Sequence, residues 1–140
     1  MDKFIIKGGK KLNGSIRVTP AKNAYLPILA GTILCEKPII LHDCPKYVDV
    51  VNMGKILENL GGNVTCNKEC KLKIDCSSLS SYKIPHELAS VLRSSIFSLG
   101  SILGRFKHAK VAYPGGCEIG ARPIDLHIKG LQALNVKIVD

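Results

Sequence analysis

The chain has 140 residues and a mass of 15.2 kDa, with 46% hydrophobic and 22% charged residues. This balance is typical of one folded domain with a core and excludes a disordered tail. The formal net charge of +9 favours anionic partners, which include nucleic acids, membrane surfaces and phosphorylated small molecules.

Two features narrow these partner classes. Aromatic residues make up only 5% of the chain and Trp is absent, which disfavours a single-stranded nucleic-acid binder. The Lys and Arg residues are dispersed, so the charge alone fits a solvated surface equally well. No apolar run reaches the about 20 residues that a bilayer crossing needs, and the first residues do not resemble a signal peptide. We therefore expect a cytoplasmic protein.

Strands and helices are expected to alternate, which predicts an α/β fold. The expected elements are strands at 4–7 and 15–19 around an Asn13-Gly14 turn, a helix capped by Thr19 that begins at Pro20 and runs to about Cys35, a strand at 39–42, a helix at 48–60 stopped by Gly61-Gly62, a hairpin of 64–66 and 72–75, a long helix from His86 to about Leu103, a strand at 109–113, a helix from about Pro123 to Leu134, and a strand from Val136. The single apolar stripe from Leu88 to Leu103 underlies the prediction of one long helix.

A faint internal repeat relates residues 50–64 to residues 124–138 at an offset of 74 residues. Matching positions are Val50/Ile124, Lys55/Lys129, Leu57/Leu131, Leu60/Leu134 and Val64/Ile138. Because a Gly or Asn ends the helix in both copies and a strand is expected to follow, we interpret the pattern as a duplicated β/α unit. The chain ends just after the second copy, so we expect a piece of a longer protein.

The six cysteines do not form a metal-binding pattern. Cys66, Cys70 and Cys76 lack the second Cys pair or closely spaced His pair that a four-ligand zinc set requires. Cys35 and Cys44 lie among apolar residues and are expected to be small core side chains. We predict free thiols and no metal.

Cys117 differs because it lies in a loop rich in Gly and Pro, from Tyr113 to Pro123. Nearby Arg122 and a following helix N-terminus would lower the pKa of its thiol. A reactive Cys and an incidental loop Cys both fit this pattern.

Two cations are further candidates. Lys22 is predicted in the first turn of a helix, where it opposes the helix dipole and either faces solvent or joins the backbone N–H groups in an anion site. Arg93 lies in an otherwise apolar, Ser-rich segment and is either a surface residue or an anion clamp.

Taken together, three segments closely resemble the enolpyruvyl transferase family, in the branch that acts on UDP-N-acetylglucosamine. The segments are Ala21-Lys22-Asn23-Ala24, Leu92-Arg93-Ser94-Ser95-Ile96 and the loop Pro114-Gly115-Gly116-Cys117-Glu118-Ile119-Gly120-Ala121-Arg122-Pro123 with Ile124-Asp125-Leu126-His127 after it. The resemblance covers the whole chain, although members of the family are about three times longer. Asn135 stands where the family more often has Gly, and Asn tolerates the left-handed conformation.

The resemblance implies an inside-out α/β barrel fold of repeated β/α units, of which this chain holds about two. It implies that residues 1–20 form the first short strands of the other domain and that residues 21–140 form an incomplete domain bearing the Cys loop. It also implies the reaction, which moves the enolpyruvyl group of phosphoenolpyruvate to the 3′-hydroxyl of UDP-N-acetylglucosamine and releases phosphate. An acidic base and another Arg are then supplied by the missing C-terminal two-thirds, and no cofactor is needed.

The same resemblance assigns roles to residues. Cys117 would be the proton donor and form a covalent adduct, while Lys22, Asn23 and Arg122 would bind phosphoenolpyruvate. The residues implied in UDP-N-acetylglucosamine binding are Arg93, Arg122, Pro123, Ile124, Asp125 and Leu126. The alternative interpretation is a non-enzymatic basic α/β module that binds nucleic acid or a protein partner, and we expect neither nucleic acid nor membrane binding if the resemblance holds.

Overall fold

The computed structural model describes residues 3–115 and 123–139. In chain order they form α1 (Lys22–Gly31), the 3-10 helix η1 (Thr32–Leu34), β1 (Ile39–Leu41), α2 (Val48–Asn59), β2 (Asn63–Cys66), β3 (Leu72–Asp75), β4 (Lys83–Ile84), α3 (His86–Ser90), the 3-10 helix η2 (Arg93–Ile96), α4 (Phe97–Phe106), β5 (Lys110–Val111) and α5 (Asp125–Ala133). The expected α/β class is confirmed.

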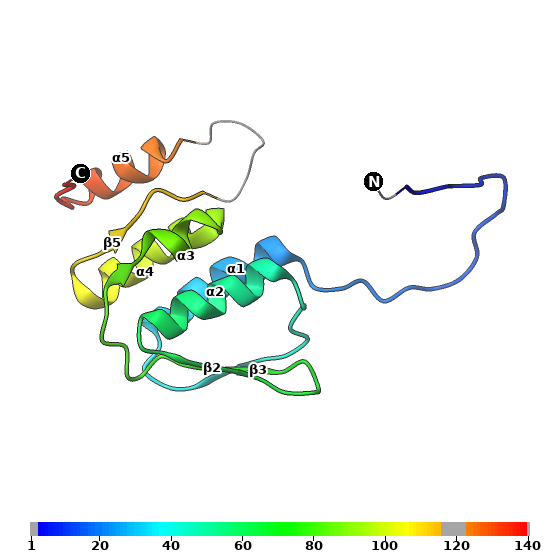
Figure 1. Ribbon diagram of the computed structural model, residues 1–140, viewed down its shortest axis with the longest axis horizontal. Coiled ribbons are helices and arrows are strands. Elements are labelled where there is room, and N and C mark those ends of the chain that lie inside the picture. Colours follow the sequence, from blue (N-terminus) through cyan, green and yellow to red (C-terminus); the bar gives the residue numbers. More distant parts are fainter. Residues whose placement is uncertain (1–2, 116–122, 140) are drawn as a thin grey trace.

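A helical layer packs over a small antiparallel sheet and forms the core (Figure 1). The sheet has the order β1-β3-β2, with Ile74 of β3 opposite Ile39 on one side and Val64 on the other. Helices α1, α2 and α4 contact one another above it. The fully buried side chains come from both layers and include Leu29, Ile33, Met53, Ile56, Leu57, Leu60, Ile74 and Ile102.

The two strands expected near the N-terminus are not present. Residues 3–21 contain no helix or strand, and their apolar side chains are almost fully exposed, as shown by Phe4 at 97% and Ile16 at 89%. The prediction was wrong because alternating apolar residues form a strand only beside a partner, and none of the described residues pairs with this segment. It extends away from the helical layer (Figure 1).

Helix α1 begins two residues later than expected. Its N-cap is Ala21, which offers no side-chain cap, so the prediction of Thr19 as cap with Pro20 at the first helical position was wrong. The hydroxyls of Thr19 and Tyr47 lie 3.4 Å apart and bond to each other instead. Lys22 is consequently the first residue of the helix.

Helix α2 and the following hairpin agree with the prediction. The N–H of Gly62 donates to the carbonyl of Leu57 and that of Gly61 to the carbonyl of Glu58, both at 2.9 Å. This pair of bonds is the Schellman motif, which needs a left-handed residue, and Gly61 has φ +101°. The same bonds recur 74 residues later, from Val136 to Leu131 at 3.0 Å and from Asn135 to Gln132 at 2.9 Å, with Asn135 at φ +61°.

The long helix expected from His86 is broken into α3, η2 and α4. Leu92 is extended at φ −138°, ψ 105°, and is buried while Val91 is half-exposed. The carbonyl of Ala89, which would accept the Arg93 N–H in a continuous helix, instead accepts the N–H of Gly115 at 3.1 Å. A side chain on Gly115 would meet the Ser90 carbonyl oxygen at 2.2 Å, so this close approach requires Gly.

The last part of the chain matches the prediction only in its helix. The strand expected at 109–113 is limited to β5, which pairs in parallel with β4, a strand that the sequence pattern did not indicate. Helix α5 forms, but residues 136–139 do not form the expected strand, because no described strand lies beside them.

Candidate functional site

Lys22 lies at the N-terminus of α1 and forms an ion pair with the start of α2. Its Nζ is 2.6 Å from Oδ2 of Asp49, which belongs to the first turn of α2. The pair is partly open to solvent, with exposed fractions of 45% for the Lys22 side chain and 33% for that of Asp49. An ion pair in such a setting contributes at most about 1 kcal/mol, so an arriving anion can replace the carboxylate at little cost.

The rest of α1 is fixed firmly under this exposed end. Tyr25, Leu26, Leu29 and Ala30 are buried, which sets the rotation of the helix and leaves its first turn, with Lys22 and Asn23, at the surface. The backbone N–H groups of that turn have no helical acceptors. The end of α1 therefore combines open backbone donors with one positive side chain, as the sequence predicted.

Arg93 begins η2, directly after the break in the expected long helix. Its side chain is half-buried. The hydroxyls of the next two residues, Ser94 and Ser95, are buried and have no hydrogen-bond partner among the described residues. This part of the chain thus holds a guanidinium beside two hydroxyl donors inside the protein.

The bond between Gly115 and Ala89 brings the beginning of the predicted Cys loop to the end of α3. The chain after β5 runs back along α3 and α4 to reach it (Figure 1). Arg93 follows three residues after Ser90, against which Gly115 packs. The structure therefore brings the loop's first described residues close to the segment that carries Arg93.

Two of the main predicted site residues, Cys117 and Arg122, lie outside the described residues. The other predicted nucleotide-sugar residues are at the start of α5, where Pro123, Asp125 and Leu126 are exposed and Ile124 is half-buried. Asp125 occupies the first turn of α5, where a carboxylate is favourable to the helix dipole.

Asp49 is a polar partner that the sequence analysis missed. An acidic residue in the first turn of a helix is common for reasons of helix stability alone, so nothing in the local pattern distinguished Asp49. Its relation to Lys22 depends on the packing of α1 on α2, which only the three-dimensional structure shows.

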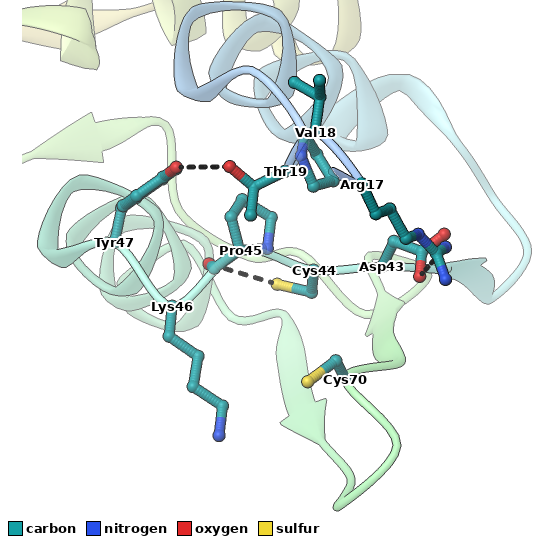
Figure 2. A pocket seen from close by; sticks show the side chains of 10 residues that line it. Arg17, Val18, Thr19, Asp43, Cys44, Pro45, Lys46, Tyr47 and Cys70 are labelled. Carbon is teal, nitrogen blue, oxygen red and sulfur yellow. Dashed lines mark hydrogen bonds and ion pairs between the residues drawn. The ribbon is translucent and has the colours of Figure 1, made fainter. Parts of the chain in front are cut away.

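A separate groove of about 530 Å³ lies between the segment before α1 and the segment before α2 (Figure 2). Its walls carry an ion pair of Arg17 with Asp43 at 3.2 Å and the hydroxyl pair of Thr19 with Tyr47. None of the predicted site residues lines it. Cys44 at its floor has a raised pKa, because burial disfavours the thiolate. Burial likewise raises the pKa of the Tyr25 hydroxyl.

Two searches concern the described residues alone. Among residues 3–115 and 123–139, no group of three or more His, Cys, Asp or Glu side chains is arranged to hold a metal ion. The described helices include none that is both long enough and apolar enough to cross a membrane.

The repeated β/α units and the fold around them define a class of protein. The chain belongs to the EPSP synthase (3-phosphoshikimate 1-carboxyvinyltransferase) family, whose family model matches residues 6–140. A crystal structure of the enolpyruvyl transferase NikO from Streptomyces tendae shares the fold with a TM-score of 0.61 at 21% sequence identity. That match covers 71% of this chain and 23% of NikO.

More similar relatives are the UDP-N-acetylglucosamine 1-carboxyvinyltransferases. Those of Coxiella burnetii strains are 46% identical over 142 aligned residues, which cover 100% of this chain and 33% of the relatives. The one from a Wolbachia of Drosophila simulans is 46% identical and covers 99% of this chain. The chain thus spans about a third of the length of the curated relatives that it matches.

Proposed function

We propose that this chain is the N-terminal third of an enzyme that transfers the enolpyruvyl group of phosphoenolpyruvate to the 3′-hydroxyl of UDP-N-acetylglucosamine. The observation that carries the proposal is the 46% identity, over the whole chain, to transferases named for this substrate. The reaction would open peptidoglycan synthesis in the cytoplasm. The position of Lys22 at an exposed helix N-terminus supports the same proposal, because phosphoenolpyruvate carries two anionic groups.

The proposed chemistry is an addition followed by an elimination. The 3′-hydroxyl adds to C2 of phosphoenolpyruvate while Cys117 protonates C3, and the C2–O bond to phosphate then breaks to release inorganic phosphate. Cys117 can also add to C2 itself and form a covalent adduct, which makes it the expected target of the epoxide antibiotic fosfomycin. Lys22 and Arg122 bind the phosphate and carboxylate, with Asn23 beside them.

UDP-N-acetylglucosamine would bind on the other side of the Cys loop. Arg93 pairs with the diphosphate, for which a planar guanidinium is well suited. Asp125 and the backbone of residues 122–126 bind the uridine. The exposure of Asp125 at the start of α5 supports this role, since a ligand there does not have to displace core residues.

Asp49 would act on the reaction through Lys22. In the absence of substrate its carboxylate holds the Lys22 ammonium at the helix end. Because the pair is partly solvated, the phosphate of the substrate can compete for Lys22. Asp49 is then a positioning residue, and its loss should affect the KM for phosphoenolpyruvate more than kcat.

The remaining two-thirds of the protein would complete the site. Residues 1–20 are proposed to form strands of the other domain, which agrees with the exposure of Phe4, Ile6 and Ile16 in this chain. That second domain would also supply an acidic base and another Arg. The chain alone is expected to be inactive, because its cations would face open water, where an ion pair with phosphate is worth about 1 kcal/mol or less.

The test is a chimera in which these 140 residues replace the matching third of the Coxiella burnetii relative. The chimera should release phosphate from phosphoenolpyruvate only when UDP-N-acetylglucosamine is present, and the 140-residue chain alone should not. Lys22→Ala and Arg122→Ala should each lower kcat/KM by roughly 30-fold or more, which corresponds to about 2 kcal/mol. Arg122→Lys should also fail because a point charge cannot replace the guanidinium fork.

Asp49→Asn in the chimera provides the milder comparison, with a raised KM and a nearly unchanged kcat. Near-normal turnover of the Lys22→Ala or Arg122→Ala chimera would refute the residue roles. Turnover by the isolated chain would refute the proposal that a second domain completes the site. A chimera that folds and binds UDP-N-acetylglucosamine but releases no phosphate would count against the function itself.

A further inference from the structure

Three cysteines meet where the hairpin turn of β2 and β3 approaches the segment before α2. Cys44 precedes α2, Cys66 ends β2, and Cys70 lies in the turn. The N–H of Cys44 donates to the carbonyl oxygen of Cys70 at 2.8 Å. Cys44 and Cys70 both line the groove and lie next to each other in it (Figure 2).

The hydrogen bond limits how far apart Cys44 and Cys70 can be. An N···O separation of 2.8 Å, added to standard backbone dimensions, places their Cα atoms at most about 6.7 Å apart. Disulfides span Cα separations of about 4.4–6.8 Å. The two backbones are therefore already within disulfide distance, without any movement of α2 or the hairpin.

The turn itself fixes the position of Cys70. The side-chain oxygen of Asn67 accepts the N–H groups of Glu69 and Lys71 at 3.0 and 2.9 Å, and the N–H of Cys70 donates to the Asn67 carbonyl at 3.2 Å. Cys70 is held in the left-handed region at φ +55°. Such a turn presents the same residue to Cys44 at all times, which favours one disulfide partner over random pairing.

The structure assigns Cys44 and Cys70 to a redox-active thiol pair that a peroxide closes to a disulfide. Cys70 is half-buried and Cys44 is 8% exposed, so Cys70 is the first to meet the oxidant. The Cys70 thiolate attacks a peroxide oxygen, the O–O bond breaks, and with hydrogen peroxide a sulfenic acid and one water form. The sulfur of Cys44 then attacks that of Cys70, and a second water leaves as the S–S bond forms. A dithiol reductant reverses both steps by exchange.

The disulfide would tie the segment before α2 to the hairpin and close a loop of about 26 residues, which restricts the unfolded chain. We expect the oxidised chain to melt several degrees higher than the reduced chain. All five described cysteines are free thiols, so the structure represents the reduced state of this pair.

The experiment uses the whole chain at low concentration. It is treated with hydrogen peroxide, the remaining thiols are blocked with N-ethylmaleimide, and unreduced peptides are mapped by mass spectrometry. A peptide joined through Cys44 and Cys70 should appear in the original chain and in Cys66→Ser, the matched control with an exposed thiol at the other end of the same turn. It should be lost in Cys70→Ser and in Cys44→Ala.

The result has a clear contrary form. A Cys66–Cys70 disulfide, or no intramolecular disulfide at peroxide levels that convert Cys70 to its sulfinic acid, would overturn the assignment. Cys44 is buried, so Cys44→Ala can alter folding; Cys70→Ser in the turn carries the test, with melting followed by circular dichroism. The melting rise should be absent from Cys70→Ser and present in Cys66→Ser.

Discussion

The two copies of the repeat have the same local structure and very different surroundings. Helix α2 and helix α5 end in the same pair of Schellman hydrogen bonds, made by residues exactly one repeat apart. In α2 the apolar residues Met53, Ile56 and Leu57 have no exposed surface, whereas α5 has no buried residue. The strand after α2 pairs with β3, and residues 136–139 after α5 pair with no described strand.

The difference separates what local sequence determines from what partners determine. A helix and its cap involve residues at most five apart, so both copies form them from their own sequence. A strand needs a neighbouring strand, and burial needs a facing surface. The second copy shows what the repeat's sequence achieves alone.

The largest expected difference is in amide hydrogen exchange. The central strand β3 is bonded on both sides, so the amides of Lys73 and Ile74 should exchange only through large-scale unfolding. The amides of Lys137 and Ile138 should exchange at least about a thousandfold faster. Exchange followed by NMR or mass spectrometry tests this, and equal protection in the two segments would show that the second copy already has a partner strand.

Large-to-small substitutions at matched positions should differ next most strongly. Leu57 is fully buried, so Leu57→Ala should cost about 2–5 kcal/mol of the free energy of unfolding. Leu131 occupies the same repeat position but is only half-buried, and Leu131→Ala should cost less than about 1 kcal/mol. Urea unfolding of both variants measures the contrast. A Leu131→Ala cost equal to that of Leu57→Ala would mean that α5 packs as tightly as α2.

The local elements of the fold could be predicted from the sequence, and the failures involve distant partners. The range of α2, its stop at Gly61 and the following hairpin agree with the prediction because their signals lie within a few residues. The break at Leu92 could not be predicted, since the apolar stripe continues through it. It depends on Gly115, more than 20 residues away, whose N–H takes the Ala89 carbonyl.

The candidate site was predicted to the same degree. Lys22 is at an exposed helix N-terminus, as its position near the start of an apolar segment indicated. Its partner Asp49 could not be predicted, because the ion pair is a product of helix packing. The roles of Cys117 and Arg122 rest on the resemblance to the family and remain predictions.

The two left-handed residues that end the helices provide a smaller contrast. Gly61 has φ +101°, and a Cβ there would lie 3.0 Å from Ser80 Oγ and 3.2 Å from the Ser78 carbonyl oxygen. Gly61→Ala should therefore cost about 2–3 kcal/mol. Asn135 is in the ordinary left-handed region at φ +61°, and Asn135→Ala should cost about 1 kcal/mol.

Asn135→Gly is the matched control for this pair and should lie within about 0.5 kcal/mol of the original chain, since Gly adopts the same conformation easily. Thermal unfolding measures all three variants. If Gly61→Ala were as mild as Asn135→Ala, the hairpin would have moved away from Gly61, and the tight packing of the first copy would not extend to its helix end.

The smallest expected difference concerns the acidic residue in the first turn of each helix. Asp49 interacts with both the dipole of α2 and Lys22, while Asp125 has no ion-pair partner among the described residues. Asp49→Asn should cost about 1 kcal/mol at low salt and Asp125→Asn only about 0.3 kcal/mol. Raised salt should shrink the cost of Asp49→Asn more, because it screens the partly exposed ion pair as well as the dipole. A double-mutant cycle with Lys22→Met isolates the pair, and a coupling energy of zero would show that the 2.6 Å contact with Lys22 adds nothing to the stability of the first copy.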